Sequence, residues 1–176
     1  VSKLPNAPQH YVLLVKTLLM EEKLDSLDIV FDNIKDNVND PQLWKVYLAG
    51  ALDRIDKMDS LRVLENAKIA KSKYNYKDEG VRLLADYIIY GQDKIKRSIE
   101  LKKIAIDTFP SNPKYSIEIM NDIIEDIPDN IYNYETLIEM YFRDNQFLRV
   151  TQLYDTLIDK ELVNFNATIV EFVTIS

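Results

Sequence analysis

Apolar residues recur three or four positions apart along almost the whole chain, which is the spacing of one face of an α-helix. The stripe that starts at Tyr11, for example, continues at Leu14, Val15 and Leu18. Later stripes include Leu24, Phe31, Trp44, Leu61, Leu84, Ile95, Ile99, Ile106, Phe109, Ile117, Leu137, Phe147 and Phe165. The pattern predicts an all-α protein with at least nine helices and no sheet.

The expected helix boundaries carry residues that helix ends favour. Asp40-Pro41 and Asn112-Pro113 each place a capping side chain before a proline at the first helical position. Gly91 falls between two stripes, where a helix end favours a positive φ. The breaks between stripes are short, so neighbouring helices should run antiparallel as hairpins.

Part of the chain repeats at an interval of 34 residues. The pentapeptide at 23–27, Lys-Leu-Asp-Ser-Leu, returns at 57–61 as Lys-Met-Asp-Ser-Leu. Apolar residues match in the same frame, as at Ile29 and Val63. A whole two-helix frame in register indicates a helical repeat.

A second match joins the two ends of the chain. Residues 134–157 match 11–34 without a gap at an offset of 123, which is three periods of 34 plus 21. Twenty-one residues correspond to one helix with its loop, so we expect an irregular extra helix near 112–129. The fold we predict is an αα-hairpin repeat solenoid, a right-handed superhelix over residues 1–176 that is a segment of a longer protein.

Composition narrows the classes of function. There is no cysteine, which excludes disulfides, thiolate metal ligands and cysteine nucleophiles. The net charge of -7 disfavours non-specific binding to nucleic acid or to an anionic membrane. No apolar run approaches the roughly 20 residues of a membrane span.

The sequence offers little for catalysis. His10 is the one histidine, and none of the three glycines belongs to a phosphate-binding loop. Adjacent carboxylates such as Glu21-Glu22 and Glu125-Asp126 point about 100° apart on a helix, so neither pair need share a site. We therefore expect no enzymatic activity, no cofactor and no metal.

One segment carries a family resemblance. Residues 133–141 read Asn-Tyr-Glu-Thr-Leu-Ile-Glu-Met-Tyr, and Val150, Leu153, Tyr154, Leu157 and Leu162 follow. This segment resembles a pentatricopeptide repeat, whose motif opens with Tyr-x-x-Leu-Ile, and residues 11–42 resemble it less closely. Tetratricopeptide repeats, with a 34-residue period, are the related family. The glycine that the pentatricopeptide family has between its two helices corresponds to Asn145 and Glu22.

The resemblance implies binding of single-stranded RNA in a mitochondrion or plastid, with two side chains of each repeat reading one base. The first reading position corresponds to Glu135 in the late repeat and to Val12 in the first, where the family has Asn, Asp, Thr or Ser. The second corresponds to Phe165 and Gln42, where the family has Asp or Asn. These departures argue against sequence-specific base reading.

Basic residues are the candidate contacts for RNA phosphates. They gather in the stripe after Gly91 and comprise Lys94, Lys96, Arg97, Lys102 and Lys103. The alternative is an ordinary solvated helix face, because Glu100 lies four positions after Lys96.

Tyrosines fall into two groups. Trp44 and the tyrosines at core spacing should pack between helices, and these are Tyr11, Tyr47, Tyr87, Tyr134 and Tyr154. The tyrosines near helix ends should be more exposed, and these are Tyr74, Tyr76, Tyr90, Tyr115 and Tyr132.

The C-terminal segment is the candidate protein interface. Its large apolar residues are Phe165, Ile169, Val170, Phe172 and Val173. A repeat array ordinarily ends in a polar capping helix, so an apolar end should pack on a further surface. The alternative is a terminal helix that folds back on Phe147 and Tyr154.

Two functions stay open at this point. One is an organellar RNA-associated factor for mitochondrial transcript maturation or translation, located in the mitochondrion and binding RNA or a ribonucleoprotein complex. The other is a tetratricopeptide-like scaffold for protein–protein interaction in a multi-subunit complex, which could equally be cytoplasmic or nuclear. Neither requires a metal or a membrane.

Overall fold

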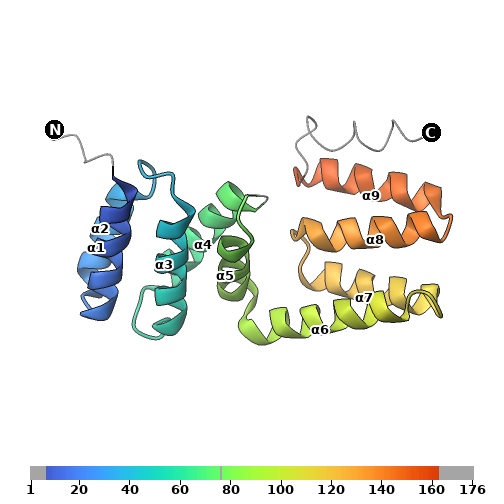
Figure 1. Ribbon diagram of the computed structural model, residues 1–176, viewed down its shortest axis with the longest axis horizontal. Coiled ribbons are helices and arrows are strands. Elements are labelled where there is room, and N and C mark those ends of the chain that lie inside the picture. The colour runs from blue at the N-terminus through green and yellow to red at the C-terminus, as the bar shows by residue number, and fades with distance from the viewer. Residues whose placement is uncertain (1–6, 76, 163–176) are drawn as a thin grey trace. The chain divides into compact units, whose positions relative to one another are not determined.

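The computed structural model describes residues 7–75 and 77–162, and every regular element in them is an α-helix (Figure 1). The nine helices are α1 (Pro8–Met20), α2 (Leu24–Ile34), α3 (Pro41–Asp53), α4 (Ser60–Tyr74), α5 (Glu79–Tyr90), α6 (Gln92–Thr108), α7 (Pro113–Asp126), α8 (Ile131–Arg143) and α9 (Phe147–Asp159). They pack mostly against neighbours in the chain, which is consistent with a helical repeat. The predicted all-α fold is thereby confirmed for the described residues, and the stripe at Phe165 lies outside them.

The helix ends follow the boundary residues of the sequence. Asp40 Oδ1 accepts a hydrogen bond of 2.8 Å from the Gln42 amide, and α3 begins at the intervening proline. Asn112 Oδ1 accepts one of 3.3 Å from the Tyr115 amide at the start of α7. Gly91 follows α5 with a φ of 87°, a conformation that glycine adopts without strain. The predicted caps are therefore confirmed.

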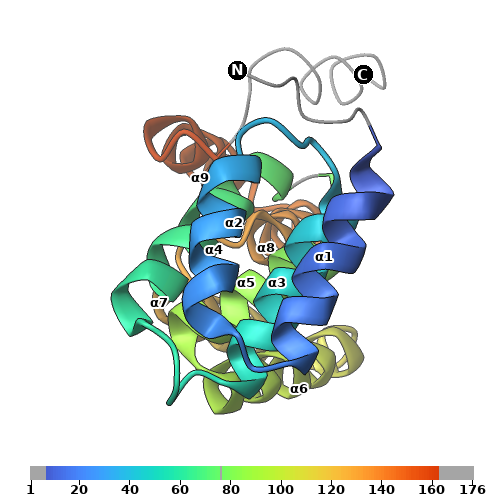
Figure 2. The same cartoon turned by 90° about the vertical axis from the view of Figure 1, so that its left-hand side faces the viewer.

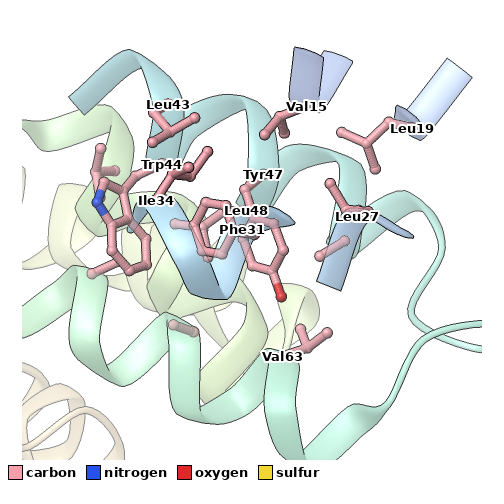
Figure 3. Close-up of a cluster of buried hydrophobic side chains, with 14 of the residues drawn as sticks. Val15, Leu19, Leu27, Phe31, Ile34, Leu43, Trp44, Tyr47, Leu48 and Val63 are labelled. Carbon is pink, nitrogen blue, oxygen red and sulfur yellow. The ribbon is translucent and has the colours of Figure 1, made fainter. Parts of the chain in front are cut away.

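The chain divides into two compact units, residues 1–95 and 96–176. In the first unit α1 packs on α2 and α3, α3 packs on α4 and α5, and α4 packs on α5 (Figures 1 and 2). The core centres on Phe31 of α2, whose ring stacks on Tyr47 at 3.8 Å and meets Trp44 edge-on at 5.0 Å (Figure 3). Such aromatic pairs stabilise beyond the area they bury.

A polar network ties α2 to α3 and α4 in this unit. Arg62 Nη1 lies 3.0 Å from Asp32 Oδ2, and Lys35 Nζ donates a 3.0 Å hydrogen bond to Asn66 Oδ1. Asn66 Nδ2 in turn donates to the Tyr47 hydroxyl at 2.8 Å. Burial raises the pKa of Tyr47 to about 12, so this hydroxyl stays neutral at any physiological pH.

In the second unit α7 packs on α8 and α8 on α9 (Figure 1). Ala105 near the end of α6 and Phe109 just after it share a core with Met120, Ile123 and Leu137. A helix, α7, is present where the sequence predicts an extra one near 112–129. That it interrupts a two-helix rhythm, and that residues 1–176 form one solenoid of a longer protein, stay predictions.

The 34-residue register is not shared by the helices, so that prediction is wrong in detail. The first helices of the two hairpins, α1 and α3, begin 33 residues apart, and the second helices, α2 and α4, begin 36 apart. Ile29 is 64% exposed, whereas its sequence match Val63 is 1% exposed. The cause is the repeated pentapeptide, which enters α2 at Leu24 but lies mostly in the longer connection before α4.

The 123-residue match, by contrast, holds in three dimensions. Helices α1 and α8 begin 123 residues apart and have 13 residues each, and α2 and α9 also begin 123 apart. Glu22 and Asn145, in the two connecting turns, have φ of 52° and 58°. Matched positions that are buried in both hairpins are Tyr11 and Tyr134, Val15 and Ile138, Leu18 and Tyr141, and Ile34 and Leu157.

Candidate functional site

The predicted RNA-contacting residues all lie on α6, but they are not equivalent. Lys102 is half-buried, and its Nζ donates hydrogen bonds of 2.7 Å to the Tyr132 carbonyl and 3.4 Å to Asn133 Oδ1. It therefore holds the first turn of α8. The other four are exposed, namely Lys94, Lys96, Arg97 and Lys103.

The buried side of α6 differs from the predicted stripe. Ile95 and Phe109 are buried as expected, whereas Ile99 and Ile106 are about half exposed. Ser98 and Ala105 are buried instead, and Ile104 is also about half exposed. The exposed side of α6 thus mixes lysines with isoleucines, a composition as well suited to protein as to phosphate.

The positions that correspond to base-reading residues face different surroundings. Val12 is half-buried against the core, whereas Gln42 and Glu135 are exposed. Burial of part of the Glu135 side chain raises the pKa of its carboxyl, and the charge of Lys102 opposes that effect. A carboxylate at position 135 would repel the phosphates of RNA. The remaining base-reading position, Phe165, lies outside the described residues.

The groups considered for catalysis lie on the surface. His10 is exposed at the start of α1, and Glu21 pairs with Lys23 at 2.6 Å. Glu22 pairs with Lys57 at 3.0 Å, and the hydrogen bond from that lysine lowers the pKa of Glu22. In residues 7–75 and 77–162 no group of three His, Asp or Glu side chains is placed to hold a metal ion. The lack of an enzymatic activity stays a prediction.

The aromatic side chains mostly take the predicted places. Tyr11, Trp44, Tyr47 and Tyr134 are buried, whereas Tyr87 and Tyr154 are half-buried. Tyr115 is exposed as expected, and Tyr90 and Tyr132 are half-buried. Exposure was the wrong prediction for Tyr74, because its ring packs near Trp44 and its hydroxyl donates a 2.9 Å hydrogen bond to Asn39 Oδ1. Tyr76 lies outside the described residues.

Two exposed apolar surfaces were not predicted from the sequence. The α1 face consists of Leu13, Leu14 and Met20 on the first helix. The α8–α9 elbow consists of Phe142, Phe147 and Leu148, and the rings of the two phenylalanines meet edge-on at 5.5 Å. Scattered exposed apolar residues are ordinary, whereas a large contiguous apolar patch marks a surface that binds other molecules.

The 123-residue correspondence explains why α1 is open. Leu14 is 40% exposed, whereas the matching Leu137 of α8 is 0% exposed. The difference arises because α7 packs on α8, and no described helix covers this side of α1. Periodicity alone could not find this surface, since both positions are leucines in equivalent stripes.

The predicted C-terminal interface (Phe165, Ile169, Val170, Phe172 and Val173) lies outside the described residues. None of the described helices is both long enough and apolar enough to cross a membrane. No family model, curated protein or solved structure matches the chain. The described residues form nine helices that pack mostly in sequence order.

Proposed function

We propose that this chain is a non-catalytic helical-repeat scaffold that binds protein, and that the α1 face accepts an amphipathic helix of its partner. The observation that carries the proposal is the contrast between Leu14, which is exposed, and Leu137, which α7 covers. Because α1 matches α8, the helix that packs on α8 is a guide to a partner helix that would pack on α1. That helix, α7, presents a stripe of large aliphatic side chains such as Ile117, Met120 and Ile123. Recognition of a helix through its apolar face is a common mode of binding.

The hairpin turns support the helical-repeat part of the proposal. Glu22 and Asn145 occupy the place of the family's glycine, and both have the positive φ that glycine favours. A hairpin that keeps this turn is compatible with a tetratricopeptide-like or pentatricopeptide-like repeat. Either kind of repeat array binds its partners on an extended concave surface.

The charge distribution favours protein over RNA. Helix α7 carries Glu118, Asp122, Glu125 and Asp126 against a single basic residue, Lys114. The polyanionic backbone of RNA would be repelled by such a surface. A scaffold within a multi-subunit complex therefore accounts for the described residues better than a base-reading protein.

A photo-crosslinking amino acid at position 13 tests this proposal in cells. We expect an adduct that is destroyed by protease and resistant to nuclease. The control places the same amino acid at Asp25, an exposed position on α2 outside the α1 face. Equal adducts at both positions, or an adduct that nuclease removes, would contradict protein binding at the α1 face.

RNA binding is the second candidate, because Lys96, Arg97 and Lys103 are all exposed on α6, and the mitochondrion is the location that the family resemblance implies. Changing these three residues to Glu should weaken RNA binding alike for every sequence and reduce its dependence on salt. Lys102 is kept because it holds the start of α8. Unchanged affinity in a filter-binding titration would exclude this helix as the RNA site.

A further inference from the structure

The α1 face carries almost no charged side chains. At about 100° per residue, Leu13, Thr17 and Met20 lie within about 60° of one another on the helix, and all three are exposed. The thirteen residues of α1 include a single Lys, Arg, Asp or Glu, which is Lys16, at the margin of this side. The α1 face can therefore be covered without burying a charge, which would be costly.

Other exposed aliphatic side chains are scattered or lie among charges. In the described residues of the first unit, those outside α1 are spread over three segments and comprise Ile29, Ile55 and Leu61. On α6, Ile99 and Ile106 are exposed, but Lys103 lies between them on the same side. Of these surfaces, the α1 face is the one that can meet an identical surface without bringing several like charges together.

The net charge of the chain is carried mostly by the second unit. Residues 1–95 contain 14 Lys and Arg against 15 Asp and Glu, a net charge of -1, whereas residues 96–176 contain 8 against 14, a net charge of -6. Two copies that meet through the first unit bring together units of almost no net charge, which favours association. Contact through the α8–α9 elbow would instead bring two acidic units together.

We propose that the occupant of the α1 face is a second copy of the chain, in a two-fold dimer in which α1 of one copy packs antiparallel on α1 of the other. The dimer rests on the proposed binding of a helix at the α1 face and names the partner that supplies it. Full overlap of residues 9–20 places the two copies of Leu13 within about one helical turn of each other. Lys16 stays at the rim, where its ammonium group remains in water.

The two-fold arrangement is closed, because each copy uses the same surface and leaves no copy of it open for a third chain. Opposed helix dipoles add to the antiparallel contact. One helix from each copy offers less than the roughly 800 Å² per partner that stable complexes bury, so we expect monomer and dimer in equilibrium with a dissociation constant on the order of 100 µM.

Sedimentation equilibrium of the purified chain tests the dimer. The mean mass should rise from that of one chain towards twice that value as the concentration passes the dissociation constant. Leu13→Asp should weaken dimerisation by about tenfold or more, because it removes two leucines from the contact and brings two carboxylates together. A chain that stays monomeric up to about 1 mM would overturn the proposal.

Leu61→Asp is the matched control. It adds the same charge to the same unit at a leucine that is 78% exposed, against 63% for Leu13, and it should leave the dissociation constant unchanged. Equal weakening by the two substitutions would show that charge alone acts, and the α1 contact would then be wrong.

A charge-swapped pair tests the two-fold axis and does not depend on the stability of one variant. Leu13→Asp and Leu13→Lys should each be monomeric alone, whereas their equimolar mixture should dimerise because opposite charges then meet across the axis. Circular dichroism checks that both variants keep their helices. A mixture of folded variants that stays monomeric would exclude position 13 from the axis.

Photo-crosslinking at position 13 separates the dimer from other protein binding at the α1 face. The pure chain and the cellular chain should both give an adduct of twice the mass of one chain. A monomeric pure chain, together with a cellular adduct that contains a different protein, overturns the dimer and leaves the proposed function standing. Equal cellular adducts at positions 13 and 25 contradict the proposed function instead.

Discussion

Single residues in the hairpin turns show how a departure from a sequence motif can preserve a backbone. Glu22 and Asn145 stand where the pentatricopeptide motif, which these segments only resemble, has glycine, and both adopt the left-handed conformation that glycine favours. In each turn the amide of the next residue bonds the carbonyl five positions earlier, at 2.9 Å and 2.8 Å. The surrounding helices and these hydrogen bonds therefore fix the turn, and the side chain accommodates it.

Replacing Asn145 should show this conformational cost. Asn145→Ala should lower the free energy of unfolding by about 1 kcal/mol, because a Cβ-bearing residue without a local polar group disfavours positive φ. Asn145→Gly should leave the free energy unchanged or raise it slightly. Urea denaturation of the three proteins measures the order, and an alanine variant as stable as the glycine variant would contradict the strained turn.

Asp28 lies in an unfavourable place on α2. Its Oδ1 is buried without a hydrogen-bond partner, and Arg62 Nη1 approaches Oδ2 only to 3.9 Å. Burial raises the pKa of Asp28, the charge of Arg62 opposes this effect, and the nearby carboxylates of Asp32, Asp59 and Asp25 add to it. The folded chain therefore binds this proton more tightly than the unfolded chain does.

Asp28 should make the stability of the fold depend on pH. The contribution of Asp28 to stability is fully present below its unfolded pKa and is lost as pH rises through the higher folded pKa. Asp28→Asn should thus raise the free energy of unfolding at pH 7, and the gain should shrink in acid. Asp155→Asn, at an exposed position of α9, provides the control. Denaturation at several pH values checks the prediction, which a pH-independent effect of Asp28→Asn would contradict.

Among the elements, the residues at which helices begin were more predictable from the sequence than the side of each helix that is buried. The capping pairs at Asp40 and Asn112 located helix starts, because they act within a few residues of the chain. The rotation of α6 was not predictable, because its isoleucines occupy more than one side and packing partners select the buried one. Ser98 is buried there, whereas Ile99 beside it is about half exposed.

A buried network of ion pairs between α4 and α5 was also not predicted from the sequence. Asp86 Oδ1 lies 2.5 Å from Lys71 Nζ, and Asp86 Oδ2 lies 3.3 Å from Arg82 Nη1. All three side chains are almost completely buried. Charged side chains are ordinarily exposed, and only the contact between the two helices brings these partners together.

Removing the shared carboxylate should cost more than removing one cation. Asp86→Ala deprives two buried cations of this partner, so it should lower the free energy of unfolding by about 3–5 kcal/mol. Lys71→Met should cost less, because Asp86 keeps Arg82. Glu139→Ala, which breaks the exposed pair with Arg143, should change stability by about 0.5 kcal/mol or less. Urea denaturation ranks the variants, and equal effects of Asp86→Ala and Glu139→Ala would contradict a structural role of the network.

For the whole molecule, the described residues fall into two compact units, while one continuous solenoid over residues 1–176 stays a prediction. Each hydrophobic cluster belongs to one unit: one cluster runs from Tyr11 to Ala85, and two others are built from α6 to α9. A boundary inside α6 carries no Gly or Pro and continues the helical pattern. No local signal in the chain marks it, because it is defined by the packing on either side.

Two separate cores should unfold as two units, and Trp44 can tell them apart. It is the one tryptophan of the chain and is completely buried in the first unit, so its fluorescence reports that unit alone, whereas circular dichroism reports both. Met120→Ala opens a cavity in the second unit and should destabilise it by about 2–5 kcal/mol. We expect the dichroism transition to broaden or split towards lower urea, while the midpoint of the Trp44 transition stays in place.

Leu48→Ala, in the core of the first unit, is the matched control and should move the fluorescence midpoint. If Met120→Ala shifts the fluorescence midpoint as far as the dichroism midpoint, the two units unfold together and their cores act as one.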